Sequence, residues 1–452
     1  MKLARRALLT AALAAPTLAR AQEGASSLRD LARRAAIYLH PVQEMYRTRW
    51  NATVNELNSF RHRLNRFQHG DLPADERARP SSTMPNKDLL YSSAWLDLST
   101  DPMFLTLPPM GDLYYSYVLL DPFTNAVATV SRRLHGGMPR PRMIVGPKWQ
   151  GDAANEVEVV RSPVNSLWLL GRILVDSPGD LQALRQIQTR ALLEIPDMRN
   201  ERRILESREL MRFRTVAPVE PVADWQAPNP ADPFDLFETA LRMLGESPLG
   251  ERESTAFEEF AALRLRPGRK FDARAFTAPQ RAAMESGIAD GRAEIQGAAP
   301  RYTRTVAGWT YPETSTDRLF RAWRAETALA QLEPAEAIYI VANADVEGRP
   351  LDGANRYTLS LIADALPPAR ACWSLSLYEV SADGRATFLS ALSDDDAKPS
   401  PGGLVEIRLQ GHQADGNWLQ TPTGPIRLVL RVYEPKPALL EGRYRLPGIK
   451  RI

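Results

Sequence analysis

The chain has 452 residues, of which 44% are hydrophobic, so it is long enough for two or three domains with buried cores. Its 57 Lys and Arg nearly balance its 54 Asp and Glu, which gives a net charge of only +3. The single cysteine, Cys372, excludes an intrachain disulfide. Because Cys372 lies in an apolar, strand-like stretch, we expect a small buried hydrophobic residue and not a catalytic thiol.

The first 21 residues have the pattern of a signal peptide. A basic start is followed by a short apolar run and by the small-x-small sequence Ala19–Ala21, so we expect cleavage after Ala21 and a periplasmic protein. The apolar run is too short to span a bilayer, and no transmembrane segment is expected in the mature chain. The Arg5-Arg6 pair also resembles a twin-arginine signal, which leaves the export route open. The alternative is an amphipathic N-terminal helix of a cytoplasmic protein.

Removing this segment changes the charge balance. It carries four basic residues and no acidic one, so the rest of the chain has 53 basic and 54 acidic residues. The sequence pI near 8.9 therefore reflects the export signal. No basic cluster with interleaved aromatic residues occurs elsewhere, and no nucleic-acid partner is expected.

Hydrophobic periodicity divides the chain into two β-rich blocks and a helical block. Residues 27–64 are helix-like with a break expected at Pro41, and residues 180–195 also predict a helix. Short apolar-polar alternating runs between 89 and 163 predict antiparallel strands, and further strands are predicted from 337 to 435. Apolar spacing of three and four residues predicts helices throughout 232–332.

Long motifs in these blocks resemble a known family. The stretches that carry the resemblance are Pro85–Asp97, Gly111–Arg133, Ile144–Asp152, Val159–Asp176, Asp345–Leu359, Trp373–Glu379 and Gly416–Pro437. They are similar to the DUF1254 and DUF1214 domains, over about 35–200 and 335–445. The resemblance implies an exported, uncharacterised bacterial protein with β-sandwich-type domains around a helical segment. Lys87 and Leu89 depart from the usual Asn and Thr of the first motif, which implies a different ligand if that loop binds one.

We therefore predict an α+β fold with two mostly antiparallel, β-sandwich-like domains joined by a helical region. The predicted boundaries are a signal peptide (1–21), an N-terminal helix with a DUF1254-like domain (22–200), a Pro-rich linker and helical region (201–334), and a DUF1214-like domain with a C-terminal arm (335–452).

The first candidate site is the polar-aromatic stretch that opens the first strand block. Asn86 and Asp88 suit a turn because their side chains bond nearby backbone. Tyr91 and Trp95 lie on one face of the following strand, where aromatic rings suit a sugar or aromatic ligand and suit a sandwich core nearly as well. Both interpretations stay open.

The second candidate site is Asp121 with Asn125. Asp121 precedes a proline at a strand end, which is typical of a turn. It could also face Asn125 at the mouth of a cleft, and with Asp88 it could form a carboxylate pair for acid–base catalysis.

The third candidate site lies in the C-terminal block. Arg356 could bind a carboxylate or phosphate in a bidentate manner, or could hold an interface through an ion pair, and Tyr357 follows it. Asn417 and Trp418 form a polar-aromatic loop with the same two interpretations.

Motifs for other chemistry are missing. The five histidines form no HxH, HxxxH or HExxH pattern, so no metal site is predicted. No GxSxG elbow, Walker loop or GxGxxG occurs, so no cofactor is predicted.

These features favour a periplasmic protein that binds or processes a small polar or carbohydrate-like molecule in a cleft between its β domains. In that hypothesis Asn86, Asp88, Tyr91 and Trp95 supply one wall, and Arg356, Tyr357 and Trp418 supply the other. Two alternatives remain: a hydrolase or lyase that uses the Asp88–Asp121 pair, and a cell-envelope scaffold without a small-molecule site. The sequence determines neither catalysis nor the oligomeric state.

Overall fold

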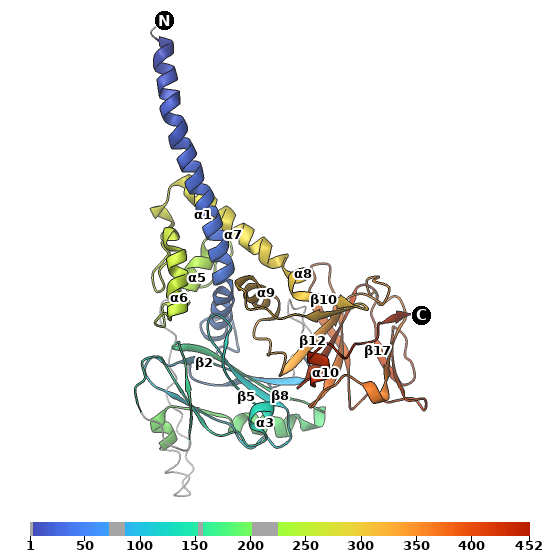
Figure 1. The fold of residues 1–452 in the computed structure, drawn as a ribbon. Coiled ribbons are helices and arrows are strands. Elements are labelled where there is room, and N and C mark those ends of the chain that lie inside the picture. Colours follow the sequence, from blue (N-terminus) through green and yellow to red (C-terminus); the bar gives the residue numbers. More distant parts are fainter. Residues whose placement is uncertain (1–2, 72–85, 152–156, 201–224) are drawn as a thin grey trace.

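The computed structural model describes residues 3–71, 86–151, 157–200 and 225–452 (Figure 1). It is 30% helical and 29% strand, with antiparallel-rich sheets in two separate β regions and a helical region between them in the sequence. The predicted α+β fold is confirmed. The segment 201–224, which opens the predicted Pro-rich linker, lies outside the described residues.

Two sheets make up the N-terminal β region. One is antiparallel with the order β1-β2-β8-β4-β5, and the other has the order β7-β6-β3-β9 with β6 and β7 parallel. The strands of the two sheets together are β1 (Gln68–His69), β2 (Leu89–Asp97), β3 (Met103–Thr106), β4 (Tyr115–Leu120), β5 (Ala126–Ser131), β6 (Arg142–Val145), β7 (Glu158–Arg161), β8 (Ser166–Leu174) and β9 (Leu192–Glu194). The helices α2 (Arg132–His135) and α3 (Leu181–Arg190) belong to the same region. The C-terminal end of the predicted 180–195 helix is therefore strand β9.

Alternation along β2 sends its side chains into two different cores. Leu90, Ala94 and Leu96 pack in the core between the two sheets. Leu89 and Trp95 pack on the opposite face, in a core shared with the helices. The larger sheet is thus buried on both faces, which requires a cover of helices on the face that the second sheet leaves free.

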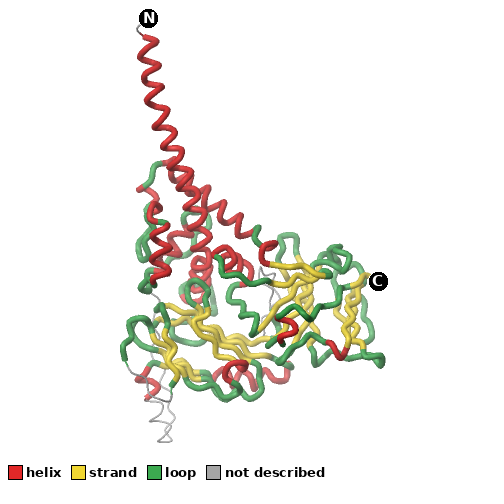
Figure 2. The backbone as a smooth tube through the Cα atoms, in the orientation of Figure 1, coloured by secondary structure: helices red, strands yellow, loops and turns green. Residues whose placement is uncertain are grey.

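Helices cover that free face (Figure 2). Its core contains residues of α1 (Leu3–Thr53) from Leu28 onward, α5 (Asp235–Leu244), α6 (Glu251–Glu259) and α7 (Ala278–Gln296). The helices α8 (Ala299–Tyr302) and α9 (Arg318–Ala328) pack with Ile37 and Ile295 in a separate cluster. None of the described helices combines the length and apolarity needed to cross a membrane.

The predicted break at Pro41 is wrong, because α1 continues through it and ends at Thr53. A proline inside a helix removes one hydrogen bond and crowds the preceding turn. Buried neighbours on both sides of Pro41, among them Leu39 and Val42, belong to the helix–sheet core, and this packing outweighs the local preference for a break.

Close contact between α1 and α7 depends on small residues. A Cβ atom added at Gly287 would lie 2.1 Å from the Arg29 carbonyl oxygen and 2.9 Å from Ala32 Cβ. Gly291 is similarly close to α1 one turn later. Arg29 also binds Asp290 at 2.7 Å, so the two backbones are held together by both packing and charge.

Two more sheets form the C-terminal β region. One is antiparallel with the order β10-β11-β12-β18-β14-β15, and the other has the order β17-β16-β13-β19. The strands are β10 (Thr303–Val306), β11 (Trp309–Pro312), β12 (Ala337–Ala342), β13 (Tyr357–Ile362), β14 (Trp373–Val380), β15 (Ala386–Ser393), β16 (Leu404–Gln410), β17 (Asn417–Gln420), β18 (Ile426–Tyr433) and β19 (Lys450–Arg451), with the helix α10 (Pro437–Leu440) near the end. Their facing side chains form one core. The hairpin β10–β11 corrects the expectation that residues 232–332 are helical throughout.

Candidate functional site

The motif that opens β2 contacts the last strand of the C-terminal sheet. Asn86 Nδ2 donates a hydrogen bond to the Tyr433 hydroxyl at 2.7 Å, and that hydroxyl donates to Asp88 Oδ2 at 3.3 Å. Ser374 on β14 donates a further hydrogen bond to Asp88 Oδ2. Asn86 Oδ1 still accepts from the Asp88 backbone N–H at 2.9 Å, as its predicted turn role requires. Turn residues of one β region therefore also bind the other.

A second polar contact joins the same two regions. Arg132 donates from Nε and Nη2 to the two carboxylate oxygens of Glu434, at 3.0 and 2.9 Å. Arg133 and Ser131 donate to Glu336 at 2.7 and 2.8 Å. Bidentate and charge-assisted bonds of this kind fix orientation as well as contributing energy.

Burial keeps the Tyr433 hydroxyl of the first contact protonated. It raises the pKa of Tyr433 well above its usual value, and the nearby Asp88 acts in the same direction. Tyr114, whose ring centroid lies 5.1 Å from that of Tyr433, shows the same rise for the same main cause. The Tyr433 hydroxyl therefore keeps its proton and remains a donor to Asp88 at physiological pH.

Beside this contact lies a cavity of about 460 Å³, which we call the interdomain cavity. Its walls come from β2 and β8 of the N-terminal region, from β12 and β18 of the C-terminal region, from the β10–β11 hairpin, and from the end of α9 with the residues that follow it. This position agrees with the general preference of ligand pockets for domain interfaces.

Two arginines line the interdomain cavity. Arg172 is 5% exposed, donates from Nη2 to the Ala330 carbonyl at 2.5 Å, and has a buried Nη1 without a partner among the described residues. Arg431 is 3% exposed and donates to Ser376 Oγ at 2.8 Å and to the Tyr378 hydroxyl at 2.6 Å. Both guanidinium groups are therefore held in place by the protein before any ligand binds.

Aromatic rings supply the rest of the wall. The Arg172 guanidinium lies 5.7 Å from the Tyr91 ring centroid, and that of Arg431 lies 5.8 Å from the Tyr339 ring. Burial raises the pKa of Tyr339 to about 12, so its hydroxyl stays a donor. Within the described part of the chain, no Asp or Glu side chain lines this cavity. The site is thus cationic and aromatic, which suits an anionic group on an apolar body.

Among the predicted first-site residues, the structure brings Asn86 and Tyr91 to the cavity wall. Asp88 is not on the wall and is bound by Ser374 and Tyr433. Trp95 is 1% exposed and stacks on Trp168 at 5.2 Å between ring centroids, inside the helix–sheet core.

The structure does not bring Asp121 to Asp88. The Asp88 backbone carbonyl accepts from the Val175 backbone N–H beyond one end of β8. Asp121 follows Leu120, which pairs with Trp168 near the other end of β8. These positions are roughly 25 Å apart along the strand at about 3.3 Å per residue. Asp121 instead accepts from the backbone N–H of Phe123 at 2.8 Å and from Asn125 Nδ2 at 2.7 Å, which is a turn.

The third predicted site lies in the sheet β17-β16-β13-β19. Arg356 is exposed, and the Tyr357 hydroxyl accepts from the Asp352 backbone N–H at 3.1 Å within the C-terminal core. Asn417 bonds the backbone of Lys398, and Trp418 Nε1 donates to the Gln410 carbonyl at 3.0 Å. None of these four residues lines the interdomain cavity.

Sequence reasoning missed the two cavity arginines. Each is a lone charge in an otherwise apolar strand, in "SLWLLGRIL" for Arg172 and "IRLVLRVY" for Arg431. A cation in the middle of a buried strand must find a partner, so this pattern was the available signal.

One group of side chains has the composition of a metal site. Ligand atoms of His40, Glu44 and Glu326 lie within 4.8 Å of one another. His40 Nε2 is 2.8 Å from Glu326, and Glu44 binds Arg47 at 2.7 Å. An arginine thus already occupies one of the carboxylates.

Comparison with protein-family models gives two matches. The model of DUF1254, described as a protein of unknown function, matches residues 64–194. The model of DUF1214, described in the same way, matches residues 336–437. The chain belongs to the DUF1254/DUF1214 two-domain family. In this DUF1254/DUF1214 protein, the contacts of Asn86 and Asp88 with Ser374 and Tyr433 join one family domain to the other.

Solved structures extend the comparison to the fold. The crystal structure of the VPA0106 protein from Vibrio parahaemolyticus is 23% identical, with a TM-score of 0.69, and the match covers 94% of this chain and 100% of that one. An uncharacterised protein from Burkholderia cenocepacia is 14% identical with a TM-score of 0.44, over 97% of each chain. No curated protein matches this DUF1254/DUF1214 chain. The first similarity shows a shared fold.

Proposed function

We propose that this protein is exported to the periplasm and binds a small organic anion in the interdomain cavity. The export signal read from residues 1–21 supports the location. The observation that carries the ligand class is the buried Arg172, whose Nη1 has no partner among the described residues and whose cavity has no carboxylate on its described wall.

The anionic part of the ligand follows from the charges. A guanidinium taken out of water requires compensation, and Arg172 has only a carbonyl bond and a ring contact among the described residues. A ligand carboxylate would supply that compensation through charge-assisted hydrogen bonds.

The apolar part follows from the shape and lining. Tyr91, Tyr339 and Trp323 contribute aromatic surface to a cavity large enough for a small organic molecule. Asn86 and Gln331 add neutral polar groups that can orient it. An aromatic carboxylate combines both requirements, and it is a narrower class than the polar or carbohydrate-like molecule expected from the sequence.

The hydrolase or lyase alternative has less support. Acid–base carboxylate pairs of glycosidases lie within about 10 Å of each other. Asp88 and Asp121 are separated by most of the length of β8. No specific observation favours the scaffold alternative over binding.

Calorimetric titration of the full chain with benzoate and with neutral benzyl alcohol tests the proposal. We expect benzoate to bind and benzyl alcohol to bind at least tenfold more weakly, a difference of about 1.4 kcal/mol. Arg172→Met keeps much of the side-chain volume and should remove the preference for the anion. Arg356→Met is the matched control, because Arg356 is exposed on the other sheet and should leave binding unchanged.

Three results would contradict the proposal. They are equal binding of the two probes, no effect of Arg172→Met, or a loss of binding in Arg356→Met. The last result would instead favour the two-walled cleft expected from the sequence.

A further inference from the structure

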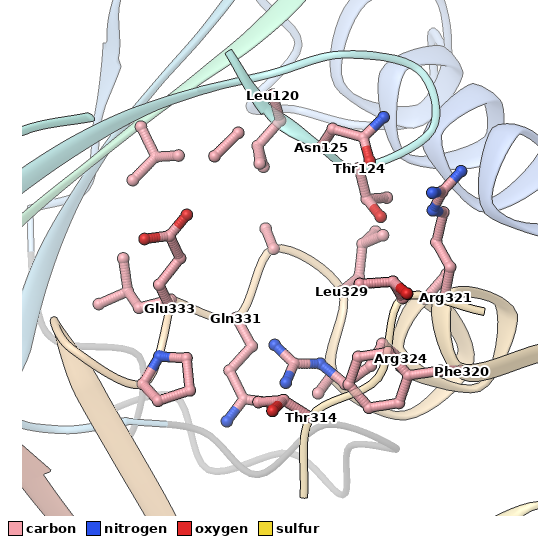
Figure 3. A pocket seen from close by; sticks show the side chains of 18 of the residues that line it. Leu120, Thr124, Asn125, Thr314, Phe320, Arg321, Arg324, Leu329, Gln331 and Glu333 are labelled. Carbon is pink, nitrogen blue, oxygen red and sulfur yellow. The ribbon is translucent and has the colours of Figure 1, made fainter. Parts of the chain in front are cut away.

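A second cavity, of about 440 Å³, lies against α9 (Figure 3). We call it the α9 cavity. Its walls are the β4–β5 turn with flanking residues of both strands, Arg252 of α6, residues 314–317, one side of α9, and the segment 328–334 with Glu336. Residues 328–331 line both this cavity and the interdomain cavity, so the two cavities are neighbours separated by one stretch of chain.

One side of the α9 cavity carries unpaired positive charge. Arg321 and Arg324 are three residues apart on α9 and therefore lie on the same helix face. Neither side chain has a hydrogen bond or ion pair with a described residue, although both are half-buried. Burial lowers the pKa of both arginines, which is the effect of a cation that lacks sufficient compensation.

The other side carries unpaired negative charge. Glu333 lies across the cavity from Arg321 in Figure 3, is exposed, and forms no ion pair with a described residue. The neighbouring carboxylate Glu336 differs, because Arg133 and Ser131 already bind it. The positive and negative sides also form no ion pair with each other.

Polar uncharged groups also line the α9 cavity. Gln331 and Thr314 are labelled beside Arg324 in Figure 3, and Asn125 lies near Thr124 in the β4–β5 turn. Asn125 is held in place by its 2.7 Å bond to Asp121. These groups can donate and accept hydrogen bonds without adding net charge.

We propose that the α9 cavity binds a small zwitterion of amino-acid size. Its carboxylate meets Arg321 and Arg324, and its ammonium group meets Glu333. A ligand with both charges compensates both sides of the cavity at once, whereas a simple anion or a simple cation compensates only one. The charged groups of this site are distinct from those of the interdomain cavity, because none of the three lines that cavity. The two cavities share only the wall formed by residues 328–331.

Thermal unfolding and calorimetry on the full chain test this site. The probes are ω-amino acids from glycine to 6-aminohexanoate, each compared with the carboxylate and the amine of the same chain length. We expect at least one ω-amino acid to bind tenfold or more tightly than both matched probes. Chain length then reports the separation of the two charged sides.

Three variants test which side chains bind the two charged groups of the ligand. Arg324→Gln should weaken binding of the ω-amino acid at least tenfold. Glu333→Gln should reduce its affinity to that of the matched carboxylate. Arg140→Gln, an exposed arginine outside both cavities, should change nothing. Circular dichroism checks that each variant is folded, and Glu333→Gln changes an exposed side chain, so it keeps the test valid if Arg324→Gln unfolds.

The outcome is separable from that of the proposed function. Arg431→Met should leave zwitterion binding intact, because Arg431 lines only the interdomain cavity and donates to Ser376 and Tyr378, which do not line the α9 cavity. Absence of binding by all the ω-amino acids overturns the inference. Affinities unchanged in both Arg324→Gln and Glu333→Gln overturn it equally.

Discussion

The side-chain amide of Asn86 donates a hydrogen bond of 2.7 Å to the hydroxyl of Tyr433, 347 positions later in the chain. Both residues are buried, and the Tyr433 hydroxyl donates in turn to the Asp88 carboxylate. A turn motif of the first domain is therefore completed by the last long strand of the second. The two domains form one structural unit at this point.

Tyr433→Phe should destabilise the protein by about 1–3 kcal/mol, because it leaves the buried amide of Asn86 without its acceptor. Denaturant unfolding measures this change. Tyr444→Phe is the matched control: its hydroxyl donates to the Ala365 carbonyl at 3.1 Å in an exposed contact, so its loss should cost less than about 0.5 kcal/mol. Equal effects of the two variants would argue against an important role for the Asn86–Tyr433 bond.

Gly287→Ala should also destabilise the fold, by about 1–3 kcal/mol, because a Cβ atom there meets the Arg29 backbone at 2.1 Å. The helices α1 and α7 would have to separate. Thermal unfolding of this variant is compared with that of Gly402→Ala, where an added Cβ atom lies 3.9 Å from the nearest atom beyond the neighbouring residues, Ser400 Oγ. A Gly287→Ala variant as stable as Gly402→Ala would contradict the close approach of the two helices.

Acidification should reveal the contribution of His69 to the free energy of unfolding. Burial lowers the pKa of His69 to about 4, whereas an unfolded histidine titrates near its usual value of 6.5. The folded state therefore resists protonation, so this stabilisation is complete above pH 6.5 and is lost as the pH falls through about 4. Its upper bound is about 3 kcal/mol.

The free energy of unfolding, measured from pH 8 to pH 4, checks this expectation. His69→Gln keeps a polar partner for Ser92, which lies 2.9 Å from His69 Nδ1, and cannot titrate. Its stability should fall less between pH 7 and pH 4 than that of the wild type. Parallel pH profiles would show that His69 does not titrate abnormally.

The Cys372 thiol should be unreactive in the folded protein. Burial raises its pKa far above the usual range, and nearby carboxylates such as Asp394 and Asp88 act in the same direction. Little thiolate then forms at pH 8. Ellman's reagent should react at least tenfold more slowly with the native protein than with the protein in guanidinium chloride. Similar rates would place Cys372 in an accessible, ionisable position.

Particular elements show how far sequence reasoning reached. The alternation in β2 correctly placed Tyr91 and Trp95 on one face, yet only the packing showed that Tyr91 lines a cavity while Trp95 is enclosed in a core. The hairpin β10–β11 was missed because its two four-residue strands lie between strongly helical stretches. The predicted helix break at Pro41 was wrong because the burial of its neighbours outweighed the local backbone preference of proline.

The sequence by itself determined the α+β class, the two β regions with helices between them, the family, and the turn roles of Asn86 and Asp121. These depend on periodicity and turn chemistry, which act between residues close together in the chain. Only the tertiary structure decided that Arg172 and Arg431 share one cavity, that Asp88 and Asp121 stay apart, and that Asn86 meets Tyr433. Such relationships depend on how separate sheets pack and register against one another, and no local pattern encodes that geometry.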